Sequence, residues 1–321
     1  MCRVARSLSA GLLPGDAAAW SAAWFCDHAD YPLKVTPYFA SLIRRCDPHD
    51  PIARQCVPSR REAEPGCEQD PLHELRFSPL PGLIHAYPDR VLLLPTSTCA
   101  VHCRHCNRRW RRMQDPVRLS PDLLAAWLDY LRGHPEAQDV LVTGGDPLTL
   151  ADEEIEELLA AVRTARPAAL LRLGTRMPAV QPARVTTRLC DRLRRFHPLY
   201  LNTQVNCRAE CTPELAAALS LLADAGLVLG NQMVLLAGVN DDAEEIAGVN
   251  RWLVRNRCRP YYLFLPEQVA GTMHFQVPLP RAIEIAESLR ARLSGLAMPH
   301  VVVDMPDARG KVPVTRGIAP R

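Results

Sequence analysis

Three cysteines within eight residues are the part of this sequence best suited to chemistry. Cys99, Cys103 and Cys106 are separated by three and then two residues, and no fourth cysteine lies nearby. A structural zinc site closes four ligands around its ion, whereas a [4Fe-4S] cluster held by three thiolates leaves one iron free to bind another molecule. The spacing therefore favours a reactive iron-sulfur cluster. A zinc site completed from a distance, or a chance grouping among the 12 cysteines, is the alternative.

A repeating order of elements from residue 90 onward indicates how this cysteine loop is positioned. Short apolar runs are each followed by a loop and an amphipathic helix, and Ser120-Pro121 and Thr212-Pro213 mark two helix starts. Such alternation predicts parallel strands with right-handed crossovers. We expect an α/β fold, a partial (β/α)6 barrel of the TIM type. The expected strands are 91–94, 140–142, 170–173, 199–202, 227–235 and 260–264, with a last strand at 300–303; the expected helices lie near 120–132, 152–165, 183–195, 213–225, 242–256 and 280–294.

The loops that follow the strands of such a barrel lie on one face, where chemistry collects. The motifs of this sequence fall in or beside those loops. Gly144 and Gly145 would let the backbone approach a ligand closely, with their amides free to meet it. An open iron is well chelated by an amino and a carboxylate group, and S-adenosylmethionine offers both. The polar residues that join the cysteines at this face are Asp146, Asn202, Gln232, Glu267, Asp304 and Lys311.

Lysine is rare in this chain. Of the 38 basic residues only Lys34 and Lys311 are lysines. A lysine can form a Schiff base through its neutral amine, which arginine cannot do. Lys34 is interpreted as an ordinary surface residue, and Cys207 and Cys211 as ordinary loop and helix-entry residues.

Several longer motifs carry a family resemblance. The three cysteines and the following glycine pair resemble the radical S-adenosylmethionine superfamily, and the chain from about residue 31 to residue 313 is similar to its lysine 2,3-aminomutase family. The motifs that carry this likeness are YPDRVLLL (87–94), CRHCNRR (103–109), LYLNT (199–203), LADAG (222–226), GNQ (230–232), RPYY (259–262), VVD (302–304) and GKVP (310–313).

The resemblance implies a role for individual residues. Cys99, Cys103 and Cys106 would bind the [4Fe-4S] cluster, and Lys311 would hold pyridoxal 5'-phosphate covalently. Arg108 would bind the substrate carboxylate through its guanidinium fork. The other expected contacts are Arg90 to the cofactor phosphate, Glu267 and Asp304 to the substrate's side-chain ammonium, and Gly144, Gly145, Asp146, Asn202 and Gln232 to the cofactors.

The implied activity is that of an amino acid 2,3-aminomutase, an isomerase. A radical derived from S-adenosylmethionine would remove hydrogen from the β-carbon of a basic L-amino acid, and the amino group would move from the α- to the β-carbon. L-lysine is the preferred substrate, and flavodoxin or ferredoxin is the expected class of electron donor. The alternatives are the β-lysine-forming enzyme of elongation factor P modification, the same chemistry on ornithine, arginine or, last, glutamate, and a cluster-binding regulatory protein without activity.

The sequence departs from the family pattern at several positions. Glu267 stands where lysine enzymes usually have aspartate, which could favour a shorter cation such as ornithine. The turn before the lysine reads PDARG (306–310) in place of a glycine-rich one, and Ala86 replaces a basic residue. Asp242 stands where longer members have a zinc-ligand cysteine. We therefore expect no structural zinc, and a homo-oligomer stays open.

Length and composition limit the classes of protein to which this chain can belong. The chain has 321 residues, of which 48% are hydrophobic and 23% charged, and a net charge of +3, which argues against binding to nucleic acid or an anionic membrane. No apolar run reaches the length of a membrane span, and no convincing signal peptide is present, so we expect a cytoplasmic enzyme. Three parts are expected: a proline-rich N-terminal extension at 1–86 with helices near 17–26 and 37–45, the radical S-adenosylmethionine core at 87–299, and a last strand with the lysine segment at 300–321.

Overall fold

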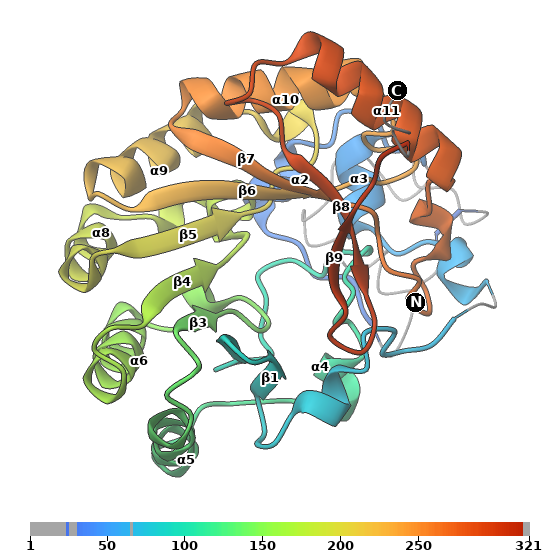
Figure 1. Ribbon diagram of the computed structural model, residues 1–321. Helices are drawn as coiled ribbons and strands as arrows, with labels where there is room; N and C mark the ends of the chain where they lie inside the picture. The colour runs from blue at the N-terminus through green and yellow to red at the C-terminus, as the bar shows by residue number, and fades with distance from the viewer. Residues whose placement is uncertain (1–23, 26–30, 65–66, 317–321) are drawn as a thin grey trace, which may run out of the picture.

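A single nine-stranded sheet organises the computed structural model, which describes residues 24–25, 31–64 and 67–316 (Figure 1). Strands β2 to β8 are parallel and neighbour one another in chain order, while β1 and β9 pair antiparallel at the two edges. The sheet curves into a half-barrel, which confirms the predicted fold class. Its strands are β1 (Leu83–Tyr87), β2 (Arg90–Leu93), β3 (Asp139–Val142), β4 (Leu170–Gly174), β5 (Leu199–Thr203), β6 (Val228–Val234), β7 (Cys258–Phe264), β8 (His300–Met305) and β9 (Gly310–Pro313).

Helices that connect the parallel strands cover the outer side of this curved sheet (Figure 1). Ser120 and Thr212 accept hydrogen bonds from the Leu123 and Leu215 amides, and a proline follows each cap, which explains why these two helices begin where they do. The helices are α5 (Pro121–Gly133), α6 (Asp152–Ala165), α8 (Thr187–Leu193), α9 (Pro213–Asp224), α10 (Ala243–Arg255) and α11 (Leu279–Arg292).

Shorter helices lie before the sheet and within its loops. They are α2 (Pro37–Ser41), α3 (Pro51–Cys56), α4 (Arg111–Gln114) and α7 (Met177–Val180), with the 3-10 turns η1 (Arg60–Ala63), η2 (Glu74–Phe77), η3 (Pro147–Thr149), η4 (Pro182–Arg184), η5 (Arg194–Phe196), η6 (Arg208–Glu210) and η7 (Met273–Phe275). Among the described residues, no helix has the length and apolar character needed to cross a membrane.

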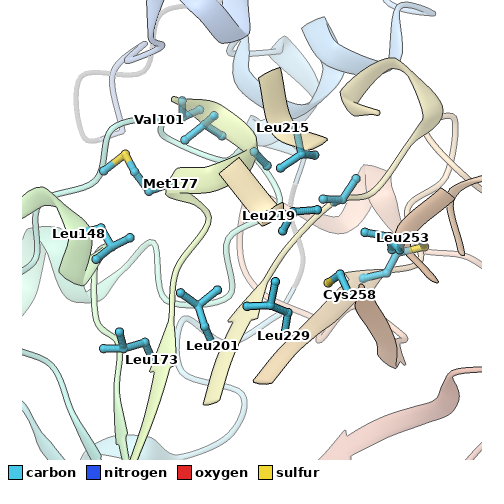
Figure 2. Close-up of a cluster of buried hydrophobic side chains, with 14 of the residues drawn as sticks. Val101, Leu148, Leu173, Met177, Leu201, Leu215, Leu219, Leu229, Leu253 and Cys258 are labelled. Carbon is cyan, nitrogen blue, oxygen red and sulfur yellow. The ribbon is translucent and has the colours of Figure 1, made fainter. Parts of the chain in front are cut away.

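Alternation along the strands separates the core from the inside of the half-barrel. Figure 2 shows Leu173, Leu201 and Leu229 side by side on one face of the sheet, packed with Leu219 from a covering helix. The residues that alternate with these leucines along each strand face the other way. Arg172, for example, precedes Leu173 and lines the central cavity. Because successive side chains of a strand point to opposite faces, one set builds the core and the other is left for function.

Most of the expected elements are confirmed, two helices differ, and one helix lies almost entirely outside the described residues. The expected helix at 183–195 is interrupted, because Thr186 caps a new helix at the Leu189 amide. The helix expected at 37–45 ends at Ser41. The helix expected at 17–26 lies outside the described residues apart from 24–25.

Two edge strands were not expected. Strand β1 begins inside the predicted N-terminal extension and pairs with β2, so the sheet starts before residue 87. Strand β9 carries Lys311, which lies opposite Asp304 in the β8–β9 hairpin. The lysine is therefore held by a strand pair and does not sit in a loose tail.

Candidate active site

A cavity of about 380 Å³ lies inside the half-barrel. It is lined by inward-facing strand residues and by the loops that follow the strands, as the barrel geometry predicts. Twelve of the 13 residues proposed from the sequence line this one cavity; Gly144 is the exception. The twelve are Arg90, Cys99, Cys103, Cys106, Arg108, Gly145, Asp146, Asn202, Gln232, Glu267, Asp304 and Lys311.

The three cysteines of the loop after β2 are free thiols that face this cavity. Burial raises the pKa of Cys99 and that of Cys106. Cys106 and Cys103 raise the pKa of Cys99 further, and Cys103 does the same for Cys106. Thiolates that disfavour one another's charge in this way need a strongly positive centre to be held together. The donor set therefore fits a [4Fe-4S] cluster bound through three cysteines.

A buried ion-pair network supports the cysteine loop from behind. Arg104 is fully buried, and its Nε and Nη2 donate to the two carboxylate oxygens of Glu62 at 2.8 and 2.6 Å. Arg109 Nη2 donates to the same carboxylate at 2.7 Å. Burial alone would raise the pKa of Glu62, but the two guanidinium groups outweigh it and hold that pKa below its usual range. The loop is thus fixed to η1 by charge-assisted hydrogen bonds.

Arg176, which was not among the residues proposed from the sequence, reaches the cysteine loop from the other side. Its Nη1 donates to Cys103 Sγ at 2.9 Å, and its Nη2 donates to Glu210 Oε2 at 3.0 Å. It lies in the loop after β4, one of the loops where function was expected, so its position was a usable signal. A guanidinium donor at a cluster sulfur would stabilise the thiolate form.

The two glycines and the aspartate after β3 act mainly on the protein itself. A Cβ on Gly144 would lie 2.7 Å from Thr96 O, and one on Gly145 would clash with Thr98 O. The Gly145 amide donates to Thr96 O at 2.7 Å. It is therefore not free to meet a ligand, contrary to the expectation from the sequence. Glycine is needed here because the backbone after β3 packs directly against the backbone that leads into the cysteine loop.

Asp146 joins the loops after β3 and β4. Its carboxylate accepts from Thr175 Oγ1 at 2.6 Å, from the Arg176 amide at 2.8 Å and from the Leu148 amide at 3.0 Å. Burial nevertheless raises its pKa. Asn202 and Gln232 line the cavity from β5 and β6, and their expected contact with a cofactor stays a prediction.

Lys311 and Asp304 form an ion pair in another part of the cavity lining. Lys311 Nζ lies 2.9 Å from Asp304 Oδ2, and the rings of Tyr87, Tyr262 and Phe264 surround this amine at 5.7 to 6.0 Å. The Tyr87 hydroxyl donates to Asp304 Oδ1 at 3.4 Å. The site therefore offers a lysine amine between flat apolar surfaces.

Arg90 extends this part of the cavity lining with a cation. Its guanidinium lies over the Tyr87 ring at 4.1 Å from the ring centre, and it also lines the cavity. An amine, aromatic faces and a nearby guanidinium are what a phosphorylated aldehyde such as pyridoxal phosphate requires. The residues present fit that cofactor.

Arg108 and Glu267 complete the lining of the cavity. Arg108 binds Glu74, with Nη2 donating to Oε1 at 2.6 Å. Burial raises the pKa of Glu267 to about 7, and the Asp304 carboxylate also raises it. Glu74 was missed because it lies in the N-terminal part, where no sequence periodicity indicates what a residue contacts.

Comparison with known proteins identifies the relatives of this chain. The profile of the Radical SAM superfamily matches residues 93–248. The L-lysine 2,3-aminomutase of Clostridium subterminale is 43% identical over 284 residues, which cover 88% of this chain and 68% of that enzyme. The L-lysine 2,3-aminomutase of Bacillus subtilis is 41% identical, with 88% and 60% covered. The glutamate 2,3-aminomutase of Clostridioides difficile is 39% identical, with 87% and 67% covered.

This chain belongs to the lysine 2,3-aminomutase family. Membership makes it an isomerase of the radical S-adenosylmethionine type, and the matched domain implies S-adenosylmethionine and a [4Fe-4S] cluster. The family resemblance read from the motifs is thereby confirmed. A solved structure of tagged anSMEcpe with bound AdoMet has a TM-score of 0.47 to this chain at 12% identity, over 62% of this chain and 58% of that one.

Proposed function

We propose that this chain is a pyridoxal phosphate-dependent 2,3-aminomutase that converts a basic L-amino acid, with L-lysine as the first candidate, into its β-amino isomer. One observation carries the proposal. A single cavity is lined by three thiols, a lysine amine, a guanidinium and two carboxyl groups. The small-molecule substrate would bind in this cavity, and an electron donor such as flavodoxin or ferredoxin would reduce the cluster.

Three kinds of residue would hold the cofactors. Cys99, Cys103 and Cys106 hold the cluster, Lys311 holds pyridoxal phosphate, and Arg90 binds its phosphate. When bound, S-adenosylmethionine and the reduced cluster supply the radical that removes hydrogen, and pyridoxal phosphate carries the migrating amino group. The protein contributes orientation, because its half-barrel places the groups that bind the substrate and the cofactors around one cavity.

Charged residues of the cavity would select a basic amino acid. Arg108 binds the α-carboxylate, while Glu267 and Asp304 bind the side-chain ammonium. Two carboxyl groups buried near each other are costly unless a cation joins them, which explains why such a site takes an ammonium and repels the side chain of glutamate. Asp304 is paired with the Lys311 amine at 2.9 Å, so engaging that amine with the cofactor leaves Asp304 available to the substrate.

The extra methylene of Glu267, compared with aspartate, supports a second candidate substrate. A longer acidic side chain shortens the space left for the substrate cation, so ornithine, which is shorter than lysine, is the next candidate. The β-lysine-forming activity of elongation factor P modification is a further alternative, in which lysine would bind in the same cavity.

Anaerobic turnover tests the proposal. The reconstituted protein would be supplied with S-adenosylmethionine, dithionite and pyridoxal phosphate, together with lysine, ornithine, arginine or glutamate, and β-amino acids would be assayed by mass spectrometry. We expect a β-product from one basic amino acid. No β-product from any of them, while S-adenosylmethionine is still cleaved, would overturn the proposed substrate class.

The chain supplies a matched control for the role of Lys311, because Lys34 is its only other lysine. After borohydride reduction we expect pyridoxal phosphate to be attached to the wild-type chain and to the Lys34→Ala variant. The Lys311→Ala variant should bind the same amount of iron but carry no attached cofactor. Equal attachment to Lys311→Ala would show that another residue holds it.

A further inference from the structure

We propose that Glu74 is the positioning residue that directs Arg108 toward the substrate carboxylate. The inference rests on the proposed function and deepens it, because it explains how one guanidinium is held ready at the carboxylate end of the cavity. Glu74 also lines the cavity, although it lies 34 residues before Arg108 in the chain.

The hydrogen bonds between the two residues occupy one edge of the guanidinium. Arg108 Nε donates to Glu74 Oε1 and Oε2 at 2.9 and 3.0 Å, and Nη2 donates to Oε1 at 2.6 Å. A guanidinium has five N–H donors in a fixed fork. The edge formed by Nε and one hydrogen of Nη2 is thus taken. No described residue bonds to the edge formed by Nη1 and the other hydrogen of Nη2, which can receive a second carboxylate.

Glu74 is itself firmly held. Its side chain is 9% exposed, and Arg111 Nε donates to Oε2 at 3.2 Å from the opposite side. Arg111 is anchored in turn by Asp115 at 2.6 Å and by Ser78 Oγ at 3.0 Å. Burial alone would raise the pKa of Glu74, but Arg108 and Arg111 outweigh it and keep that pKa below its usual range. Glu74 is therefore a charged and rigid support at neutral pH.

This geometry has a consequence for binding. Arg108 has four rotatable side-chain bonds, and ordering such a side chain on binding costs free energy. Because Glu74 already orders it, the substrate carboxylate can form two parallel hydrogen bonds with the remaining edge without that cost. Glu74 therefore acts through Arg108, as a positioning residue.

Substrate-binding measurements on a Glu74→Gln variant test this role. Glutamine keeps the shape of the side chain but loses the charge that aligns the guanidinium. The dissociation constants of L-lysine and of its methyl ester would be measured by calorimetry on the pyridoxal phosphate-loaded protein. The ester keeps both amino groups but lacks the carboxylate charge, so the comparison isolates the Arg108 end of the site.

We expect Glu74→Gln to raise the dissociation constant of lysine about tenfold, and that of the ester less than about twofold. Glu64→Gln is the matched control, because Glu64 lies on the surface and pairs with Arg61, away from the cavity; it should change neither constant. Equal weakening of lysine and ester would indicate a merely structural role and overturn the inference, as would unchanged binding of both.

A second variant and a separate control keep the test decisive. If Glu74→Gln does not fold, as judged by iron content and circular dichroism, Glu74→Asp retains the charge at a shorter reach and should weaken lysine binding by about threefold with the same sparing of the ester. If the wild-type protein itself converts no basic amino acid, the proposed function fails. If it does so while neither variant alters the selectivity for lysine over its ester, only the role of Glu74 fails.

Discussion

Glu267 shows how burial tunes a single residue of this site. Its carboxyl group has no ion-pair partner among the residues that the structure describes, and burial raises its pKa to about 7. The group is therefore half-ionised near neutral pH. A substrate ammonium that approaches it would favour the charged form and pull the pKa back down.

The pH dependence of substrate binding follows from this pKa. Below about pH 7 Glu267 is largely protonated and cannot attract an ammonium, whereas above it the carboxylate does. We expect the KM for lysine to fall as the pH rises from about 6 to about 8, in the range where the pKa places the change. Glu267→Gln should have a high KM that no longer changes with pH. A wild-type KM that is flat across this range would contradict the role given to Glu267.

The raised pKa of Glu267 makes the stability of the ligand-free protein change with pH in the direction opposite to substrate binding. A group whose folded pKa lies above its unfolded value contributes stability at low pH and loses it as the pH rises through the folded value. Above pH 7 Glu267 therefore promotes substrate binding and lowers the stability of the ligand-free protein. This is typical of a residue placed for function.

At the scale of elements, the loops after β2 and β3 act as one unit. The Gly145 and Asp146 amides donate to the carbonyl oxygens of Thr96 and Thr98, both at 2.7 Å. The cysteine loop begins directly after Thr98, so its starting direction is set by the loop after β3. The glycine pair thus positions the cluster ligands through backbone contacts.

Substituting Gly145 tests this coupling. In Gly145→Ala the added methyl would clash with the Thr98 carbonyl, and we expect unfolding free energy to fall by about 1 to 3 kcal/mol. Iron bound per chain after reconstitution should fall as well, because the displaced backbone carries Cys99. Gly133→Ala, at the end of α5 where a methyl meets nothing within 4 Å, is the control and should keep both values. Full iron loading of Gly145→Ala would show that the two loops are not coupled.

The elements themselves differ in how well the sequence predicts them. The parallel strands are buried and flanked by amphipathic helices, so their apolar runs and capping residues indicate them clearly. Most residues of the edge strands β1 and β9 are partly or fully exposed, so these strands leave little apolar pattern.

The residues of the site also differ in how well the sequence predicts them. Residues at the ends of parallel strands, such as Asp146 and Asp304, could be proposed because the topology brings those ends together. The supporting residues Glu62 and Glu74 could not, because their arginine partners lie 42 and 34 residues away and no periodic pattern links them. Their function is visible only once the N-terminal part is folded against the loops.

At the scale of the whole molecule, the N-terminal part closes the open side of the half-barrel. His73 and Arg76 both bind Asp307, at 2.9 and 2.7 Å, so this segment reaches the turn between β8 and β9 (Figure 1). The same segment carries Glu74, which binds Arg108 next to the cysteine loop. Residues before β1 therefore contact both Arg108, beside the cysteine loop, and the turn that precedes Lys311.

Glu62 is the residue on which this closure depends most. It holds Arg104 and Arg109 in a buried network, and Glu62→Gln would leave two guanidinium groups without a compensating charge. We expect a loss of about 3 to 5 kcal/mol in the free energy of unfolding, measured by urea denaturation at pH 7. Asp129→Asn removes an exposed pair with Arg132 and should change it by less than about 0.5 kcal/mol.

The pH dependence gives the same network an independent test. Because the pKa of Glu62 is lowered in the folded protein, its contribution is present above the unfolded value of about 4.3 and is lost as the pH falls through the folded value. The difference in stability between wild type and Glu62→Gln should therefore be large at pH 7 and shrink in acid. A difference that stayed below about 1 kcal/mol at pH 7 would mean that the N-terminal part is held to the cysteine loop by its apolar contacts, with the ion pairs adding little.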